Sequence, residues 1–120
     1  MARILIVDDE ESDRVLLQAI LERAGHETFL AEDGEEALRK YQLKGIEVVI
    51  TDLQMPDVHG FELITVIRDF HPPPAVIAVS GTGTFQLQMA EALGAHSTIA
   101  KPVIPELLLD AVERALADTV

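Results

Sequence analysis

Short apolar runs alternate along the chain with longer segments in which apolar residues recur at helical spacing. The apolar runs cover residues 4–7, 26–31, 48–51, 76–79 and 97–100. Runs of this length that are bounded by polar residues predict buried strands of a parallel sheet. The five strand–helix units predict a doubly wound α/β fold with helices on both faces of the sheet, because crossovers between parallel strands are right-handed.

The segments between these runs carry apolar residues at helical spacing and residues that are typical of helix ends. We predict helices over residues 11–24, 33–45, 60–70 and 105–116, and a fourth helix, after the loop of residues 81–84, that ends near residues 93–94. Asp33, followed three residues later by Glu36, is typical of a capping box at the start of the second helix. The residues of the first helix that we expect to face the core are Leu16, Leu17, Ile20 and Ala24.

The composition is that of an acidic, folded protein. The chain has 120 residues, of which 48% are hydrophobic, so we expect residues 1–120 to form one domain. Its formal net charge of −12 argues against binding to nucleic acid or to an anionic membrane, since both require a basic surface. The absence of cysteine excludes disulfides and thiolate metal sites. The first apolar run is too short for a signal peptide and no run approaches a membrane-spanning length, so we expect a cytoplasmic location.

Polar side chains follow four of the apolar runs. Asp8 and Asp9 come directly after the first run and Asp52 after the third. Ser80 and Lys101 follow the fourth and fifth runs. Ligands of doubly wound sheets bind outside the carboxyl ends of the strands. We therefore expect these five side chains to meet at one edge of the sheet.

The types of these side chains indicate a site for a cation and a phosphoryl group. Clustered carboxylates repel one another unless a cation joins them. Oxygen ligands at a small site suit Mg²⁺ best, with Mn²⁺ plausible and Ca²⁺ less so. Lys101 would supply a positive charge to a phosphoryl oxygen and Ser80 a hydrogen-bond donor. One carboxylate would accept the phosphoryl group as an acyl phosphate.

Each residue also has a common structural role when it is considered alone. An acidic pair after a strand is typical of a helix cap, and a single aspartate at a strand end is typical of a turn. Lys101 precedes Pro102 and would ordinarily be a surface lysine. The shared position of all five residues at strand ends favours the binding site.

Four short motifs in a fixed order narrow the interpretation. They are Ile4-Leu5-Ile6-Val7-Asp8-Asp9-Glu10, Asp52-Leu53-Gln54-Met55-Pro56 with Gly60, Ser80-Gly81, and Gly94-Ala95 with Lys101-Pro102. In this order and at these spacings they resemble the receiver domain of two-component response regulators, over essentially the whole chain. The resemblance implies a flavodoxin-like sheet with strand order 2-1-3-4-5.

The same resemblance implies the acceptor and the metal ligands. Asp52 would be the phosphoacceptor and would also belong to the ligand set of Mg²⁺. Asp9 would be a direct ligand and Asp8 a nearer or water-mediated one. The backbone carbonyl of Gln54 would be the third protein ligand.

The segment around Lys101 both follows the family pattern and departs from it. The resemblance implies that Lys101 and Ser80 hold phosphoryl oxygens and that the Lys101–Pro102 bond is cis. Thr98 stands where receiver domains commonly carry tyrosine or phenylalanine, so the aromatic switch of the family is missing. Val103 stands where phenylalanine is usual.

The resemblance also implies protein partners. A histidine kinase or a histidine phosphotransfer protein would donate the phosphoryl group, and a further protein would be the regulated target. Val15 and Ala19 lie on the side of the first helix where the family docks its histidine-bearing partner. A candidate surface for output or for a homodimer is expected over Phe85, Leu87, Met89 and Leu109.

The leading hypothesis is a signalling phosphoacceptor that catalyses only its own phosphorylation and dephosphorylation, and so is not an enzyme in the ordinary sense. An alternative is a phosphorylation-independent, receiver-like interaction module, which the missing aromatic at Thr98 would suit. A phosphatase of the haloacid-dehalogenase type is disfavoured, because those enzymes carry D-x-D after the first strand and here Asp8 and Asp9 are contiguous. The chain ends near its last predicted helix, and the sequence leaves open whether it acts alone or within a longer regulator.

Overall fold

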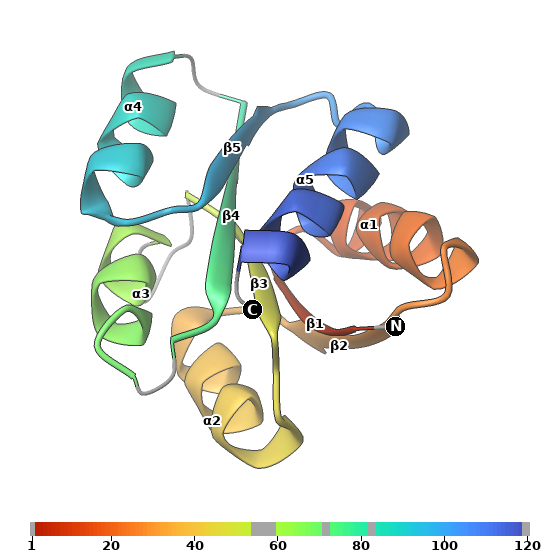
Figure 1. Cartoon of the computed structure of the whole chain (residues 1–120), viewed down its shortest axis with the longest axis horizontal. Coiled ribbons are helices and arrows are strands. Elements are labelled where there is room, and N and C mark those ends of the chain that lie inside the picture. Colours follow the sequence, from red (N-terminus) through yellow and green to blue (C-terminus); the bar gives the residue numbers. More distant parts are fainter. Residues whose placement is uncertain (1, 54–59, 71–72, 82–83, 119–120) are drawn as a thin grey trace.

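Five parallel strands form one sheet in the computed structural model, which describes residues 2–53, 60–70, 73–81 and 84–118 (Figure 1). The strands are β1 (Arg3–Val7), β2 (Glu27–Ala31), β3 (Val48–Asp52), β4 (Ala75–Ser80) and β5 (Ser97–Ala100). Their order in the sheet is β2-β1-β3-β4-β5. The predicted doubly wound α/β fold and its strand order are therefore confirmed.

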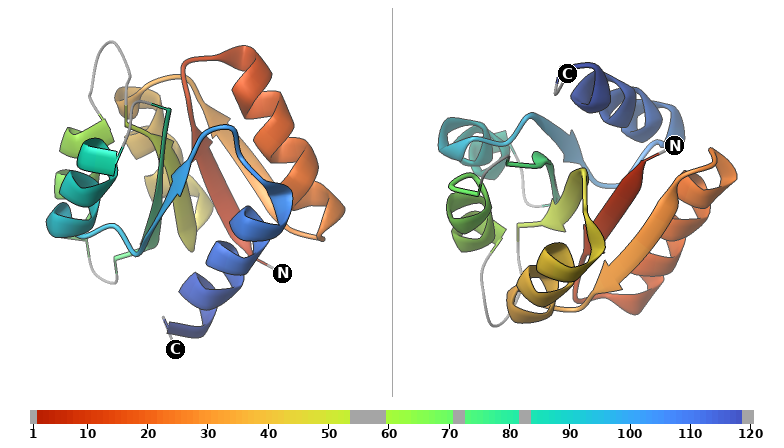
Figure 2. Two further views of the ribbon diagram at one scale, coloured as in Figure 1. Left: turned by 90° about the horizontal axis from the view of Figure 1, so that it is seen from above. Right: turned by 60° about the horizontal axis from the view of Figure 1, so that its bottom comes forward.

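Helices cover both faces of this sheet (Figure 2). They are α1 (Glu11–Arg23), α2 (Gly34–Lys44), α3 (Gly60–Ile67), α4 (Thr84–Leu93) and α5 (Pro105–Asp118). α1 and α5 lie on one face, and α2, α3 and α4 lie on the other. Among the described residues, no helix combines the length and the apolar character that crossing a membrane requires.

The two faces of the sheet bury two separate hydrophobic cores. In β1, Ile4 and Ile6 pack beneath α1 and α5, whereas Leu5 and Val7 pack toward the helices of the opposite face. Successive side chains of a strand point to opposite faces, so a strand that is covered on both sides requires an unbroken apolar run. This is why the strands read as continuous hydrophobic segments in the sequence.

The structure confirms both predicted ends of the second helix, α2. The Asp33 carboxylate accepts a hydrogen bond from the Glu36 backbone N–H at 2.9 Å. The Glu36 carboxylate in turn accepts from the backbone N–H of Glu32, one residue before the cap, at 2.8 Å. Gly45 ends the helix with a φ of 65°, a left-handed conformation that glycine adopts without strain.

The predicted core side of α1 is partly wrong. Leu17 is buried, but Leu16 is 49% exposed, and Ala24 is exposed at the end of the helix. The buried residues of α1 are Arg14, Leu17 and Leu21, whose spacing of three and four defines the inward stripe. Leu16 therefore lies beside this stripe.

Candidate functional site

Three carboxylates lie together at the carboxyl ends of β1 and β3. Val7 pairs with Thr51, so Asp8 and Asp9, which follow β1, lie beside Asp52, the last residue of β3. One carboxylate oxygen from each of the three aspartates lies within 4.8 Å of the others. The prediction that these side chains meet at one edge of the sheet is confirmed.

Asp8 and Asp52 are buried, and Asp9 is exposed. Burial raises the pKa of the Asp8 carboxyl above its ordinary value. The Glu10 backbone N–H, which donates to Asp8 Oδ1 at 2.9 Å, and the nearby Lys101 ammonium offset part of this increase. A buried carboxylate with so few donors is stabilised further by any cation that joins the cluster.

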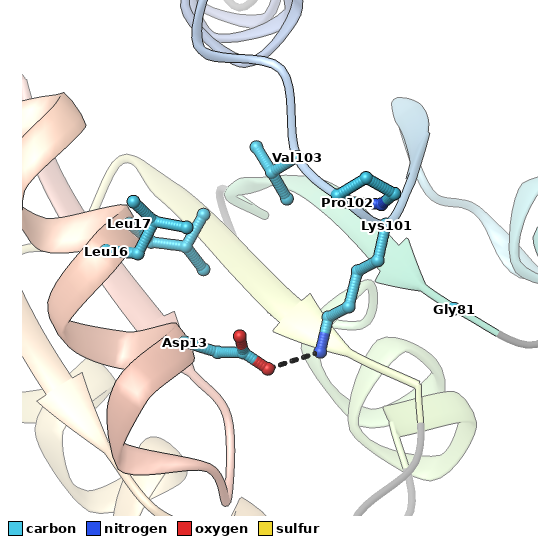
Figure 3. Close-up of a pocket in the computed structure, with 7 residues that line it drawn as sticks. All are labelled: Asp13, Leu16, Leu17, Gly81, Lys101, Pro102 and Val103. Atoms are coloured by element: carbon cyan, nitrogen blue, oxygen red, sulfur yellow. Dashed lines mark hydrogen bonds and ion pairs between the residues drawn. The ribbon is translucent and has the colours of Figure 1, made fainter.

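Lys101 reaches the cluster from the end of β5. Its Nζ lies 3.3 Å from Asp8 Oδ2 and 3.6 Å from Asp52 Oδ2. It lies closest to Asp13 Oδ2, at 2.9 Å (Figure 3). Burial lowers the pKa of the Lys101 ammonium, but these carboxylates outweigh burial and raise it, so the group stays charged. The Lys101–Pro102 peptide bond is cis, as the resemblance implies.

Ser80 lies at the same edge as the carboxylates. It is the last residue of β4, it is buried, and it pairs with Ala100 of β5. Its backbone carbonyl accepts a hydrogen bond from the Lys101 N–H at 2.9 Å. Ser80 and Lys101 are therefore adjacent at the edge that carries the carboxylates. Gln54, the expected carbonyl ligand, lies outside the described residues.

The sequence analysis missed two residues of α1 that contact this site. Asp13 forms the shortest ion pair of Lys101. Arg14 is buried, and its Nη1 donates to the backbone carbonyl oxygen of Asp8 at 2.6 Å, while its Nη2 lies 3.5 Å from Glu32. In the sequence both resemble solvated helix charges. The signal in the sequence is their position, because a helix that begins within four residues of the end of β1 places its first turn near the strand end.

The arrangement fits a hard divalent cation. Asp8, Asp9 and Asp52 offer carboxylate oxygens, the ligand type that Mg²⁺ and Mn²⁺ prefer. Three negative charges exceed the single positive charge of Lys101, so a divalent ion improves the local charge balance. The ammonium of Lys101 lies beside Asp8 and Asp52, so an anion bound next to such an ion would face a second positive charge.

The fold and the site together define a class of protein. A doubly wound sheet of order 2-1-3-4-5 that gathers carboxylates, a hydroxyl and a lysine at its carboxyl edge is the architecture of a signalling receiver. The model of the response regulator receiver domain matches residues 4–113. The chain belongs to this family, whose members are the phosphoacceptor domains of two-component systems and bind Mg²⁺ at an acidic pocket.

Similar proteins and structures agree with this assignment. The chain is 34% identical over 115 residues to the chemotaxis protein CheY of Thermotoga maritima, covering 93% of this chain and 95% of CheY. It is 31% identical over 113 residues to the sensory/regulatory protein RpfC of Xanthomonas campestris, covering 90% of this chain but only 16% of RpfC. A crystal structure of a receiver domain protein from Clostridium thermocellum superposes with a TM-score of 0.93 at 32% identity, covering 99% and 97% of the two chains.

The surface predicted for output or for a homodimer is only partly exposed. Met89 is 43% exposed, whereas Leu87 and Leu109 pack against the two cores. The side chain of Phe85 lies outside the described part of the structure. Thr98 is half-buried on β5 and lines a cavity of about 390 Å³ beside α5. Among the apolar side chains next to Thr98, Ile104 and Leu107 are more exposed than Met89.

Proposed function

We propose that this chain accepts a phosphoryl group on Asp52, in a reaction that depends on Mg²⁺ or Mn²⁺. The observation that carries the proposal is the position of Asp52. Its carboxylate is buried at the end of β3, lies within 4.8 Å of Asp8 and Asp9, and lies 3.6 Å from the Lys101 ammonium. A nucleophilic carboxylate, a cation site and a fixed lysine are the groups that phosphoryl transfer to an acyl phosphate requires.

The phosphoryl transfer is a single displacement at phosphorus. An oxygen of Asp52 attacks phosphorus, and the bond from phosphorus to the donor's imidazole nitrogen breaks as the acyl phosphate forms. The electron pair of that bond leaves with the imidazole, whose other ring nitrogen carries a proton, so that neutral histidine is released. Lys101 and Ser80, which border the site, would donate hydrogen bonds to phosphoryl oxygens. A bound divalent ion, held by Asp8, Asp9, Asp52 and the Gln54 carbonyl, would neutralise the charge that approaches.

The phosphodonor is proposed to be a phosphohistidine of a histidine kinase or a histidine phosphotransfer protein. RpfC and the Vibrio cholerae sensor kinase/phosphatase CqsS are among the similar proteins. The chain covers 16% and 17% of their lengths, so their sensing activities are not carried over to it. We also propose that the receiver domain extends over residues 1–120, that phosphorylation regulates binding to a further protein, and that the chain forms a homodimer.

α1 offers the surface on which the donor would dock. Val15 is 53% exposed, Leu16 is 49% exposed, and Ala19 is exposed beside them. Leu16 and Ala19 also line a cavity of about 470 Å³ between α1 and α5. Because α1 begins two residues after Asp9, a helix that binds here would bring its histidine close to Asp52.

The direct test is intact-protein mass after incubation with acetyl phosphate, with and without Mg²⁺, for the wild type and Asp52→Asn. We expect one phosphoryl adduct in the wild type that requires the ion and is lost in the variant. A folded wild-type protein that binds the ion but forms no adduct would contradict the proposal. That result would favour a phosphorylation-independent interaction module.

A further inference from the structure

We propose that Asp13 restrains Lys101 in the unphosphorylated protein and thereby slows phosphoryl transfer to Asp52. The inference rests on the proposed function of Asp52. Asp13 lies in the first turn of α1 and does not belong to the three-carboxylate cluster. It nevertheless makes the shortest contact of the Lys101 ammonium, at 2.9 Å, compared with 3.6 Å for Asp52.

The restraint follows from the hydrogen-bonding capacity of Lys101. An ammonium group has three N–H donors. Three carboxylates, those of Asp8, Asp13 and Asp52, already surround the group at 2.9 to 3.6 Å. A phosphoryl oxygen on Asp52 must compete with these acceptors, and movement of the ammonium toward it lengthens the contact with Asp13.

The position of Lys101 at the site does not depend on Asp13 alone. Asp8, which is buried, accepts from the ammonium at 3.3 Å. The Lys101 backbone N–H is bonded to the Ser80 carbonyl. The stem of Lys101 passes close to Gly81, where an added Cβ would lie 3.7 Å from Lys101 Cβ. Removal of the Asp13 charge is therefore expected to release the ammonium without removing it from the site.

The charge of Asp13 acts in the same direction as its hydrogen bond. A carboxylate this close to the phosphoryl position repels a negatively charged phosphodonor. The Asp13 side chain is 37% exposed, so solvent screens both effects. The free energy of a partly exposed ion pair of this kind corresponds to a change of about two- to fivefold in the rate of phosphoryl transfer.

The Asp13–Lys101 pair also links the site to the docking surface. Both side chains line a cavity of about 420 Å³, together with Leu16 of α1 and Val103 after β5 (Figure 3). Leu16 lines the neighbouring cavity between α1 and α5 as well. Loss of the pair on phosphorylation would thus alter the surface proposed to bind the phosphodonor.

The test compares the initial rates of phosphoryl adduct formation from acetyl phosphate in saturating Mg²⁺, followed by intact-protein mass. We expect Asp13→Asn to react about two- to fivefold faster than the wild type. Asp13→Glu keeps a carboxylate at this position and is expected to react at a rate closer to the wild type. Glu10→Gln is the matched control, because it removes an exposed charge next to Asp9 without touching the Lys101 contact.

A second measurement reports the lysine itself. The chain has three lysines, Lys40, Lys44 and Lys101, so their side-chain signals are few in a spectrum of protein labelled at lysine. Without phosphodonor, Asp13→Asn is expected to shift the Lys101 side-chain signal and to leave the other two unchanged. This shift would show that Asp13 contacts Lys101 in solution, and the faster adduct formation would show that the contact restrains the transfer.

Three results would overturn the restraint. They are an unchanged or slower rate in Asp13→Asn, an equal acceleration in Glu10→Gln, and an unshifted Lys101 signal. Failure of the proposed function can be distinguished from failure of the restraint, because neither the wild type nor any variant would then form an adduct. That outcome would remove the restraint together with the phosphoacceptor role. An adduct that forms in the wild type, and faster in Asp13→Asn, would support both proposals.

Discussion

The guanidinium of Arg14 donates a hydrogen bond to the backbone carbonyl oxygen of Asp8 at 2.6 Å. The bond joins the first turn of α1 to the segment that carries Asp8 and Asp9, and the arginine is buried. A buried charge that pairs with a backbone carbonyl is costly to replace, because the carbonyl then loses its charged donor. Arg14 is therefore a structural support of the acidic cluster.

Arg14→Met is expected to lower the free energy of unfolding by about 1–3 kcal/mol, measured by urea denaturation in EDTA. It is also expected to weaken Mg²⁺ binding, because the Asp8–Asp9 segment loses its anchor. Arg23→Met provides the control, since Arg23 is exposed in the last turn of the same helix, and its effect should stay within about 0.5 kcal/mol. Equal losses in the two variants would show that the hydrogen bond to Asp8 has no special importance.

The hydrophobic pattern predicted the fold because both faces of the sheet are covered. A strand such as β3 is buried along its whole length, so its unbroken apolar run and the polar residues around it are visible in the sequence. The positions of Asp8, Asp52 and Lys101 followed from the same pattern. Each of them ends a strand or follows one directly, and the carboxyl ends of parallel strands share an edge.

The contacts of Asp13 and Arg14 could not be predicted in this way. The first turn of a solvent-facing helix commonly carries charges, so neither residue type is informative by itself. The error at Leu16 has a related cause. Leu16 and Leu17 are adjacent and equally apolar, and only the packing of α1 on the sheet determines that Leu17 faces inward.

Neighbouring apolar residues of α3 provide a test of the core. Ile64 is fully buried, whereas Val66 is 42% exposed two residues later on the same helix. Ile64→Ala is expected to lower the free energy of unfolding by about 2–5 kcal/mol, because it removes buried methylene groups and leaves a cavity. Val66→Ala should change it by about 0.5 kcal/mol or less. Similar losses in urea denaturation would mean that α3 does not pack on the sheet as described.

The raised pKa of Asp8 predicts how stability depends on pH when no divalent ion is present. Burial raises this pKa in the folded state, so the folded protein binds the proton more tightly than the unfolded chain does. The contribution of Asp8 to stability is therefore full below its ordinary pKa of 3.8 and is lost as the pH rises through the higher folded value. Asp8→Asn removes the carboxyl and therefore this loss of stability at higher pH.

In EDTA at neutral pH, Asp8→Asn is accordingly expected to melt at a higher temperature than the wild type. The difference should shrink as the pH is lowered toward 4, where the wild-type carboxyl takes up its proton. Asp110→Asn serves as the control, because Asp110 is exposed and pairs only with the nearby Arg114 in the described structure. A melting temperature of Asp8→Asn at or below the wild-type value throughout this pH range would contradict the argument.

The acidic cluster predicts that Mg²⁺ stabilises the folded protein selectively. An ion that binds only the folded state adds about 2.7 kcal/mol when its free concentration is 100 times its Kd. The melting temperature of the wild type should therefore rise with Mg²⁺ concentration at constant ionic strength. Asp9→Asn removes an exposed member of the cluster and is expected to abolish most of this increase. Glu10→Gln, which removes the neighbouring charge outside the cluster, should retain it. Equal increases in the three proteins would show that the ion acts by general screening.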